Sequence, residues 1–142
     1  MSIKFSNNFG TTISGSINDS ATTISIASAA GFPTLGLGDF AFCTLQKESP
    51  RTLEIVKVTA VSGTDLTVVR GQDGTSAAAF ASGDAFELRV TAGGLNEVIT
   101  GAAASETNAA TSAASALASE NAAAVTAAAL SSEITALAIA LG

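Results

Sequence analysis

Apolar and polar positions follow two different periods along the chain, and the change falls at residues 91–94. Before it, apolar residues recur at every second position or gather in short runs, as they do in β-strands. The segments with this pattern are 23–26, 40–45, 52–61, 66–70 and 86–91. Residues 62–65, Ser-Gly-Thr-Asp, separate two of them as a short turn, which predicts a β-hairpin. Residues 21–92 are therefore predicted to form an antiparallel β domain.

Two of these strands also predict which side chains face the core. In 52–61 the apolar positions favour one inward face, and in 86–91 apolar residues alternate strictly with charged or polar ones. The residues expected in the core are Leu53, Ile55 and Val58 from the first strand and Phe86, Leu88 and Val90 from the second.

Residues 1–20 do not have the pattern of a packed domain. They are rich in Asn, Ser, Thr and Gly, with isolated apolar residues spaced two and four apart. This favours an N-terminal arm or edge strands. An arm could add a strand to the sheet of a neighbouring molecule, whereas the alternative is a local pair of strands within the N-terminal segment.

Beyond residue 94 the pattern becomes helical. Residues 102–141 contain no Gly and no Pro, and eighteen of the forty are alanine, the strongest helix former. Steps of four and three counted back from Leu141 meet fourteen positions, twelve of them apolar. We therefore predict a helical shaft over 93–142, about 70 Å long, that forms a coiled coil. The predicted seam is Leu95, Ile99, Ala102, Ala109, Ala113, Ala116, Ala123, Ala127, Leu130, Ile134, Leu137 and Leu141.

The two polar positions of this seam are Glu106 and Glu120. Either the register slips locally, so that Leu117 and Asn121 replace Ala116 and Glu120, or the glutamates form rings of carboxylates that repel one another in a symmetric bundle. Both interpretations keep the fold class unchanged. That class is α+β, with an N-terminal antiparallel β-sandwich or barrel followed by a long C-terminal helix.

The composition of the chain argues against some classes of binding partner. The chain of 142 residues has a net charge of −6 and scattered bases, so it has no basic surface for nucleic acid. The polar N-terminus shows no signal peptide. No uninterrupted apolar run reaches 18 residues, so no membrane partner is expected. The single cysteine, Cys43, lies in an apolar strand and is expected to be a small core residue.

The sequence has few combinations of residues that could support catalysis. The absence of His excludes Ser-His and Cys-His pairs and the usual zinc sites. Asp65, Asp73 and Asp84 stand at glycine-flanked turns, where side-chain hydrogen bonds to the backbone account for them. A calcium site built from Asp73 and Asp84 is the alternative. We therefore predict no enzyme and no cofactor.

The most specific stretch is Leu66 to Asn96, LTVVRGQDGTSAAAFASGDAFELRVTAGGLN. With TTISIASAAGFP and GDFAFCTL upstream, it resembles a domain of tail-fibre and other virion structural proteins of tailed bacteriophages, including cyanophages. The resemblance covers about residues 20–96. It implies a virion protein, a short tail fibre or fibre-base component, that is a homotrimer and contacts other tail or capsid proteins. The alternatives are a capsid decoration or head-fibre protein and a host-surface carbohydrate-binding module, which the absence of Trp and Tyr disfavours.

The RGQDGT loop is the candidate docking surface within that resemblance. Its residues are Arg70, Gly71, Gln72, Asp73, Gly74 and Thr75. Its glycines permit positive φ. The Arg70 guanidinium has five donors, which are expected to reach loop carbonyls or Asp73. A purely structural role for the loop is the alternative.

Overall fold

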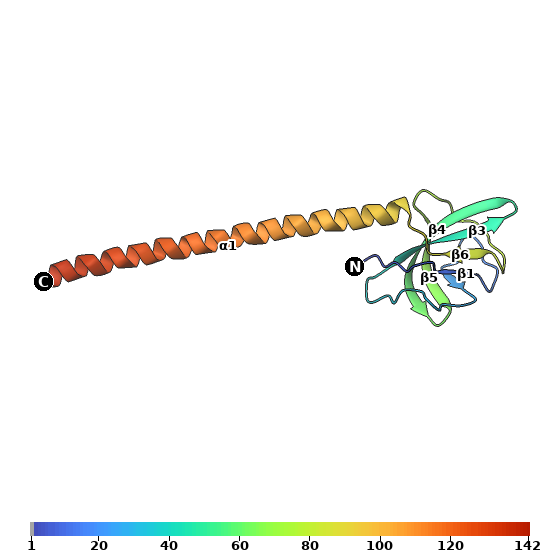
Figure 1. Ribbon diagram of the computed structural model, residues 1–142, viewed down its shortest axis with the longest axis horizontal. Coiled ribbons are helices and arrows are strands. Elements are labelled where there is room, and N and C mark those ends of the chain that lie inside the picture. Colours follow the sequence, from blue (N-terminus) through green and yellow to red (C-terminus); the bar gives the residue numbers. More distant parts are fainter. Residues whose placement is uncertain (1) are drawn as a thin grey trace. The chain divides into compact units, whose positions relative to one another are not determined.

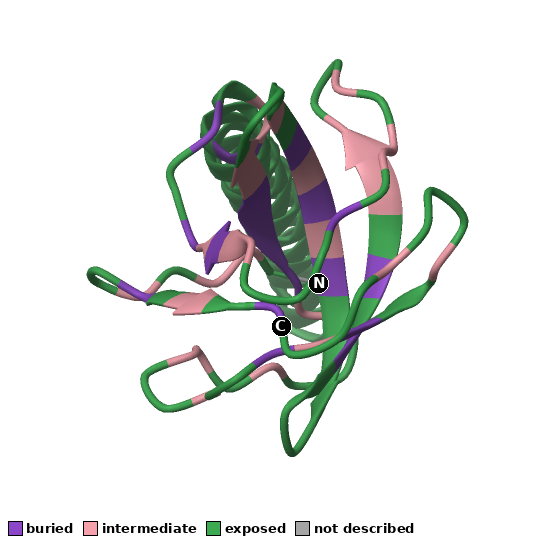
Figure 2. Ribbon diagram, turned by 90° about the vertical axis from the view of Figure 1, so that its right-hand side faces the viewer, coloured by how far each residue is buried: buried purple, intermediate pink, exposed green. Residues whose placement is uncertain are grey.

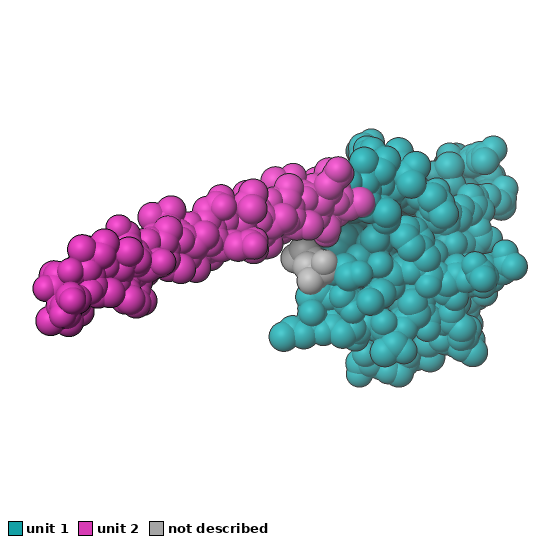
Figure 3. Space-filling view, turned by 60° about the vertical axis from the view of Figure 1, so that its left-hand side comes forward, with its two compact units in different colours: residues 1–99 teal, residues 100–142 magenta. Residues whose placement is uncertain are grey.

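A computed structural model describes residues 2–142; Met1, the first residue of the expected N-terminal segment, lies outside the described residues. The chain divides into two compact units, Met1–Ile99 and Thr100–Gly142 (Figure 3). The elements are β1 (Gly10–Thr12), β2 (Thr23–Ser25), β3 (Ala41–Glu48), β4 (Arg51–Ser62), β5 (Asp65–Gln72), β6 (Ala85–Glu87) and α1 (Ala92–Leu141).

The six strands form one antiparallel sheet in the order β1-β6-β3-β4-β5-β2. The sheet curls until its two edge strands approach each other at a bridge between Ile13 and Ile26 (Figure 1). There the Ser14 N–H donates to the Ser25 carbonyl at 2.8 Å. The predicted β domain followed by a long helix is confirmed, and the sheet is a partly closed barrel rather than a sandwich.

The two longest strand pairs form the frame of this sheet. β3 and β4 are paired from Ala41–Val58 to Glu48–Arg51, so the strand expected at 40–45 extends to the turn at Ser49–Pro50, which has a cis peptide bond. The predicted hairpin of β4 and β5 is confirmed, with Gly63 at positive φ in its turn.

The inward face of β4 differs from the prediction. Val58 is buried as expected, but the other buried positions are Glu54 and Val56, while Leu53 is 41% exposed and Ile55 is half-buried. The prediction was therefore wrong for Leu53 and Ile55. Strand periodicity places alternate residues on one face, and on β4 a glutamate occupies a position of the core face because an arginine pairs with it there.

The last strand is shorter than predicted. Phe86 and Leu88 are buried as expected, but Val90 is 72% exposed and does not belong to the core. Pairing of β6 ends at Glu87, so the alternation at 88–91 no longer reports the faces of a sheet.

The described N-terminal residues pair within their own domain. β1 lies beside β6, and isolated bridges join Ile3 to Phe40 and Ile17 to Phe80. In this chain the segment thus forms an edge of its own sheet by pairing with residues distant in the sequence, and not as a local N-terminal strand pair.

Helix α1 spans 50 residues, about 75 Å at the usual rise per residue. Thr91 caps it, because its Oγ1 accepts from the Gly94 N–H at 3.0 Å. From Leu95 onward every residue is exposed, which Figure 2 shows as an uninterrupted green helix. In the described residues 2–142, the apolar side chains of this helix from Leu95 onward are therefore left uncovered.

Candidate functional site

The predicted seam residues all lie on α1 and are all exposed. Their spacing by three and four places them along one stripe of the helix. Large side chains stand at its two ends, Leu95 and Ile99 at one and Leu130, Ile134 and Leu137 at the other. The structure thus presents the seam as free surface.

Outside the seam, α1 carries hydroxyl side chains as well as alanines and a few larger apolar residues. Seven Ser and Thr side chains donate to the carbonyl four residues earlier, at 2.9–3.0 Å. They are Ser105, Thr107, Thr111, Ser115, Ser119, Thr126 and Thr135. None of them stands at a seam position. Since such hydroxyls are satisfied by their own helix, the seam is distinguished by lacking them.

α1 is also long and apolar enough to cross a membrane by length and composition. The sequence analysis looked for an uninterrupted apolar run, whereas a helix dominated by alanine passes on its average although Ser and Thr interrupt it. An experiment on the helix must therefore distinguish binding to lipid from binding to other copies of the chain.

The most buried polar group of the β domain is the ion pair of Glu54 and Arg70. The Arg70 Nη2 lies 2.7 Å from the Glu54 Oε2, with side chains 7% and 0% exposed, and Nε donates to Oε1 at 2.7 Å. The same carboxylate accepts from the backbone N–H groups of Gly71 and Ala78, both at 2.9 Å. A bidentate pair with further donors satisfies the buried charge.

Arg70 also ties three backbone segments together. Its Nη1 donates to the carbonyls of Asn18 at 2.7 Å and Ala21 at 3.3 Å, and its Nη2 donates to the carbonyl of Ala78 at 2.6 Å. The expectation of loop carbonyl partners is confirmed, but the carboxylate partner is Glu54, not Asp73. Arg70 therefore links the loops around it through hydrogen bonds to their carbonyl groups.

The pKa of Glu54 reflects these partners. Burial alone raises the pKa of a carboxyl group, but the Arg70 hydrogen bonds, the Ala78 and Gly71 N–H groups and the charge of Arg70 outweigh it. The net result is that the pKa of Glu54 is lowered, so the group is ionised at neutral pH.

Asp73 of the RGQDGT loop instead contacts the start of α1. It adopts a positive φ of 52°, and its Oδ2 accepts from the Gly93 N–H at 2.8 Å. A Cβ at Gly93 would lie 3.0 Å from the Asp73 carboxyl, so a larger residue there would require this carboxylate to shift by a few tenths of an ångström. The carboxylate thus satisfies one of the free N–H groups at a helix N-terminus.

The remaining loop residues stabilise the turn. Thr75 Oγ1 donates to the Gln72 carbonyl at 2.7 Å and accepts from the Ile55 N–H at 2.9 Å. Gly71 and Gly74 have positive φ. The hydrogen bonds found in this loop are thus internal, and its use as a docking surface stays a prediction.

Glu54 was missed by reasoning from the sequence. The only signal was its phase, since it alternates with Val56 and Val58. Because a glutamate between apolar residues is usually solvent-facing, that signal could be recognised only with its arginine partner in place.

An apolar groove of about 400 Å³ lies on the outer side of β4. Its lining includes Leu53, Ile55, Val90 and Ala92, the apolar residues that the β core leaves uncovered and the first residue of α1. The polar residues that line it are Thr44, Asp73, Thr75, Arg89 and Thr91. Asp73, Thr75 and Thr91 have hydrogen-bond partners within the chain, and Arg89 pairs with Glu87.

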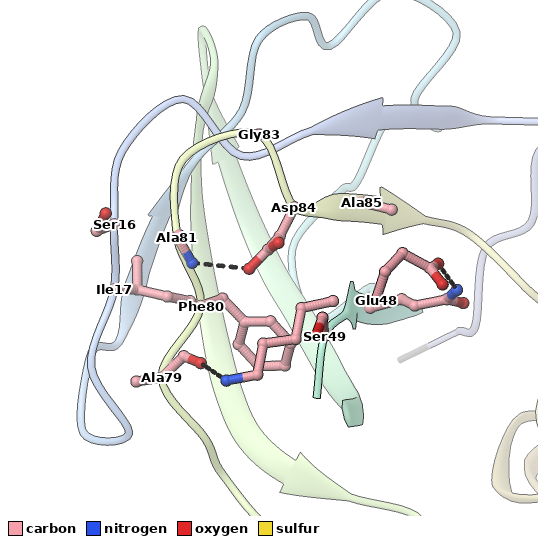
Figure 4. A pocket seen from close by; sticks show the side chains of 12 residues that line it. Ser16, Ile17, Glu48, Ser49, Ala79, Phe80, Ala81, Gly83, Asp84 and Ala85 are labelled. Atoms are coloured by element: carbon pink, nitrogen blue, oxygen red, sulfur yellow. Dashed lines mark hydrogen bonds between the residues drawn. The ribbon is translucent and has the colours of Figure 1, made fainter. Parts of the chain in front are cut away.

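A second hollow, of about 670 Å³, lies beside Phe80 (Figure 4). Its charged residues are engaged internally: the Lys47 Nζ donates to the Ala79 carbonyl at 3.1 Å, and Asp84 accepts from the Ala81 N–H at 2.7 Å. Glu48 accepts from Gln46. The charged residues of this hollow are thus accounted for by hydrogen bonds within the chain.

The other candidate chemical groups have structural partners as well. Asp65 accepts from the Ser25 hydroxyl at 2.5 Å, and burial raises the pKa of Cys43. Within residues 2–142, no group of three or more Cys, Asp and Glu side chains is arranged to hold a metal ion.

Comparison with known proteins finds no family model and no curated protein that matches this chain. The resemblance to phage fibre domains therefore rests on the residues of the 66–96 stretch and their context alone.

Proposed function

We propose that this chain is a structural protein of a tailed-phage virion, a short tail fibre or fibre-base component. Its β domain docks on another virion protein, and its helix assembles with copies of itself. The observation that carries the proposal is the helix α1, 50 residues long and exposed from Leu95 onward.

Most helix stability in proteins comes from packing of an apolar face, and a seam of Ala, Leu and Ile without hydroxyls supplies such a face on α1. Three copies, the number implied by the resemblance to phage fibres, would bury the large residues at both ends of the seam. Each fully buried Leu or Ile contributes roughly 1.5–3 kcal/mol. The alanines in the middle of the seam would let the helices approach one another closely, but each alanine would bury little apolar area.

The β domain supports the docking half of the proposal. Its buried apolar residues form one cluster, and the Glu54–Arg70 pair bonds to the backbone of the loops around it. A rigid small domain with a preformed surface binds a partner without ordering new segments. The same features would suit a capsid decoration or head-fibre protein, and the position of the protein in imaged particles separates these two roles.

Sedimentation equilibrium of the full chain, beside a version that ends at Ile99, tests the proposal. A trimer for the full chain and a monomer for the shortened one support the helix as the assembly element. A full chain that is monomeric at high concentration with its helix folded contradicts the proposal. Flotation with phosphatidylcholine and phosphatidylglycerol vesicles then tests whether the helix binds lipid instead.

A further inference from the structure

The groove on β4 and the start of the helix seam share a residue. Ala92 lines the groove, and it stands three residues before Leu95 and seven before Ile99. A spacing of seven returns to the same face of a coiled-coil helix. The stripe that begins with Leu95 and Ile99 therefore runs back into the groove.

The surface formed is apolar and uncovered. Leu53 is 41% exposed, Val90 is 72% exposed, and Leu95 is exposed beyond them. All of these residues belong to the compact unit Met1–Ile99. Three polar groups of the lining have partners within the chain, as Asp73 accepts from the Gly93 N–H, Thr91 accepts from the Gly94 N–H, and Arg89 pairs with Glu87. The groove therefore offers apolar contact beside side chains that are already paired.

We propose that this groove is a contact between copies, in which one copy receives the Val90–Leu95 segment of the next. The inference rests on the proposed self-assembly through α1. In a parallel bundle, residues at the same level of each helix meet, so the neighbour's segment at the level of Ala92 is the one around its own Val90. A contact that joins one surface to a different surface on the next copy closes into a ring under cyclic symmetry, which suits a trimer.

This contact assigns the exposed apolar residues of the β domain a role that the helix alone does not. It extends the coiled-coil interface onto the sheet and sets where the seam begins. The exposed position of Val90, unexplained by the β core, follows from it.

Two variants of the full-length protein test the contact. Leu53→Glu changes the groove alone, and Val90→Glu changes a residue that lines the groove of its own copy and also belongs to the inserted segment. Each places a carboxylate without a partner into the contact, so we expect the trimer to dissociate about 100-fold more readily or more. The matched control is Val69→Glu, on exposed β5 outside the groove, which should change the dissociation constant less than about threefold. Sedimentation equilibrium measures all three, and hydrogen exchange of the β4 amides verifies the fold.

If Leu53→Glu does not fold, Val90→Glu decides alone, because a side chain so exposed contributes little to the fold. Wild-type affinity in the folded variants, or weakening no greater than that of Val69→Glu, overturns the groove contact while self-assembly through the helix stands. A monomeric wild-type chain overturns both proposals together.

Discussion

The β domain and the C-terminal helix differ in where their groups find partners. In the β domain, apolar side chains close one core, and even the buried charge of Glu54 is matched by Arg70 within the chain. In the helix, the backbone and seven hydroxyls are satisfied internally, but no apolar side chain beyond Gly94 is buried. The comparison teaches that local hydrogen bonding can complete an element of structure while leaving its apolar surface to another molecule.

The largest effect is expected where the β domain depends on a single interaction. Arg70→Met leaves the Glu54 carboxylate buried without its cation, which should lower the free energy of unfolding by about 3–5 kcal/mol. Hydrogen exchange of the β4 amides in increasing urea measures it. The control is Arg89→Met, which removes the exposed pair with Glu87 and should cost less than about 1 kcal/mol. Equal effects would contradict the central role of the buried pair.

The next effect concerns the helix. Ile134→Asp places a charge on the seam and removes an isoleucine whose burial contributes roughly 1.5–3 kcal/mol per chain, so assembly should weaken. Ile139→Asp is the matched control, an isoleucine five residues away and off the seam. Sedimentation equilibrium and helix content at micromolar concentration compare them. Equal weakening by both would mean that the helix uses a different face.

A smaller effect is expected at the start of α1, where the helix follows the β domain in the sequence. Asp73→Ala removes the acceptor of the Gly93 N–H and should destabilise the first turns of α1 by about 0.5–2 kcal/mol. Faster hydrogen exchange at residues 93–99 reports it. Asp84→Ala removes a comparable turn carboxylate elsewhere and should leave those residues unchanged. Unaltered exchange in Asp73→Ala would show that Thr91 alone fixes the helix start.

The smallest effect at neutral pH is the titration of Glu54. Because its pKa is lowered in the folded state, the unfolded chain takes up the proton first, near the ordinary value of about 4.3. The stabilisation is therefore complete above that pH and is lost as the pH falls through the folded pKa. Urea unfolding of the β domain at a series of pH values measures this loss. Glu54→Gln should show a shallower decline below about pH 4.3, and an identical decline would assign the acid sensitivity to other carboxyl groups.

Several features of the fold were predictable because the forces that set them act between near neighbours. Alanine content and the absence of Gly and Pro specify a helix over 102–141 without any partner. The turn at Gly63 joins two alternating segments, so the β4–β5 hairpin could be predicted from its own sequence. The coiled coil that the three-and-four spacing predicts along this helix stays a prediction.

Other features depended on contacts between distant residues. The phase of β4 was set by the pairing of Glu54 with Arg70, sixteen residues away, and it moved Leu53 to the surface. The start of α1 is held in part by Asp73, twenty residues before Gly93. A buried glutamate contradicts local preference, and only its arginine partner explains it.

The sequence by itself therefore determined that a β domain is followed by one long helix, because alternation and alanine content act along the chain. The tertiary structure decided which face of β4 is the core, how the sheet curls until Ile13 meets Ile26, and where the first helical turn is held. These depend on atoms brought together by folding, whose identity as partners no local pattern encodes.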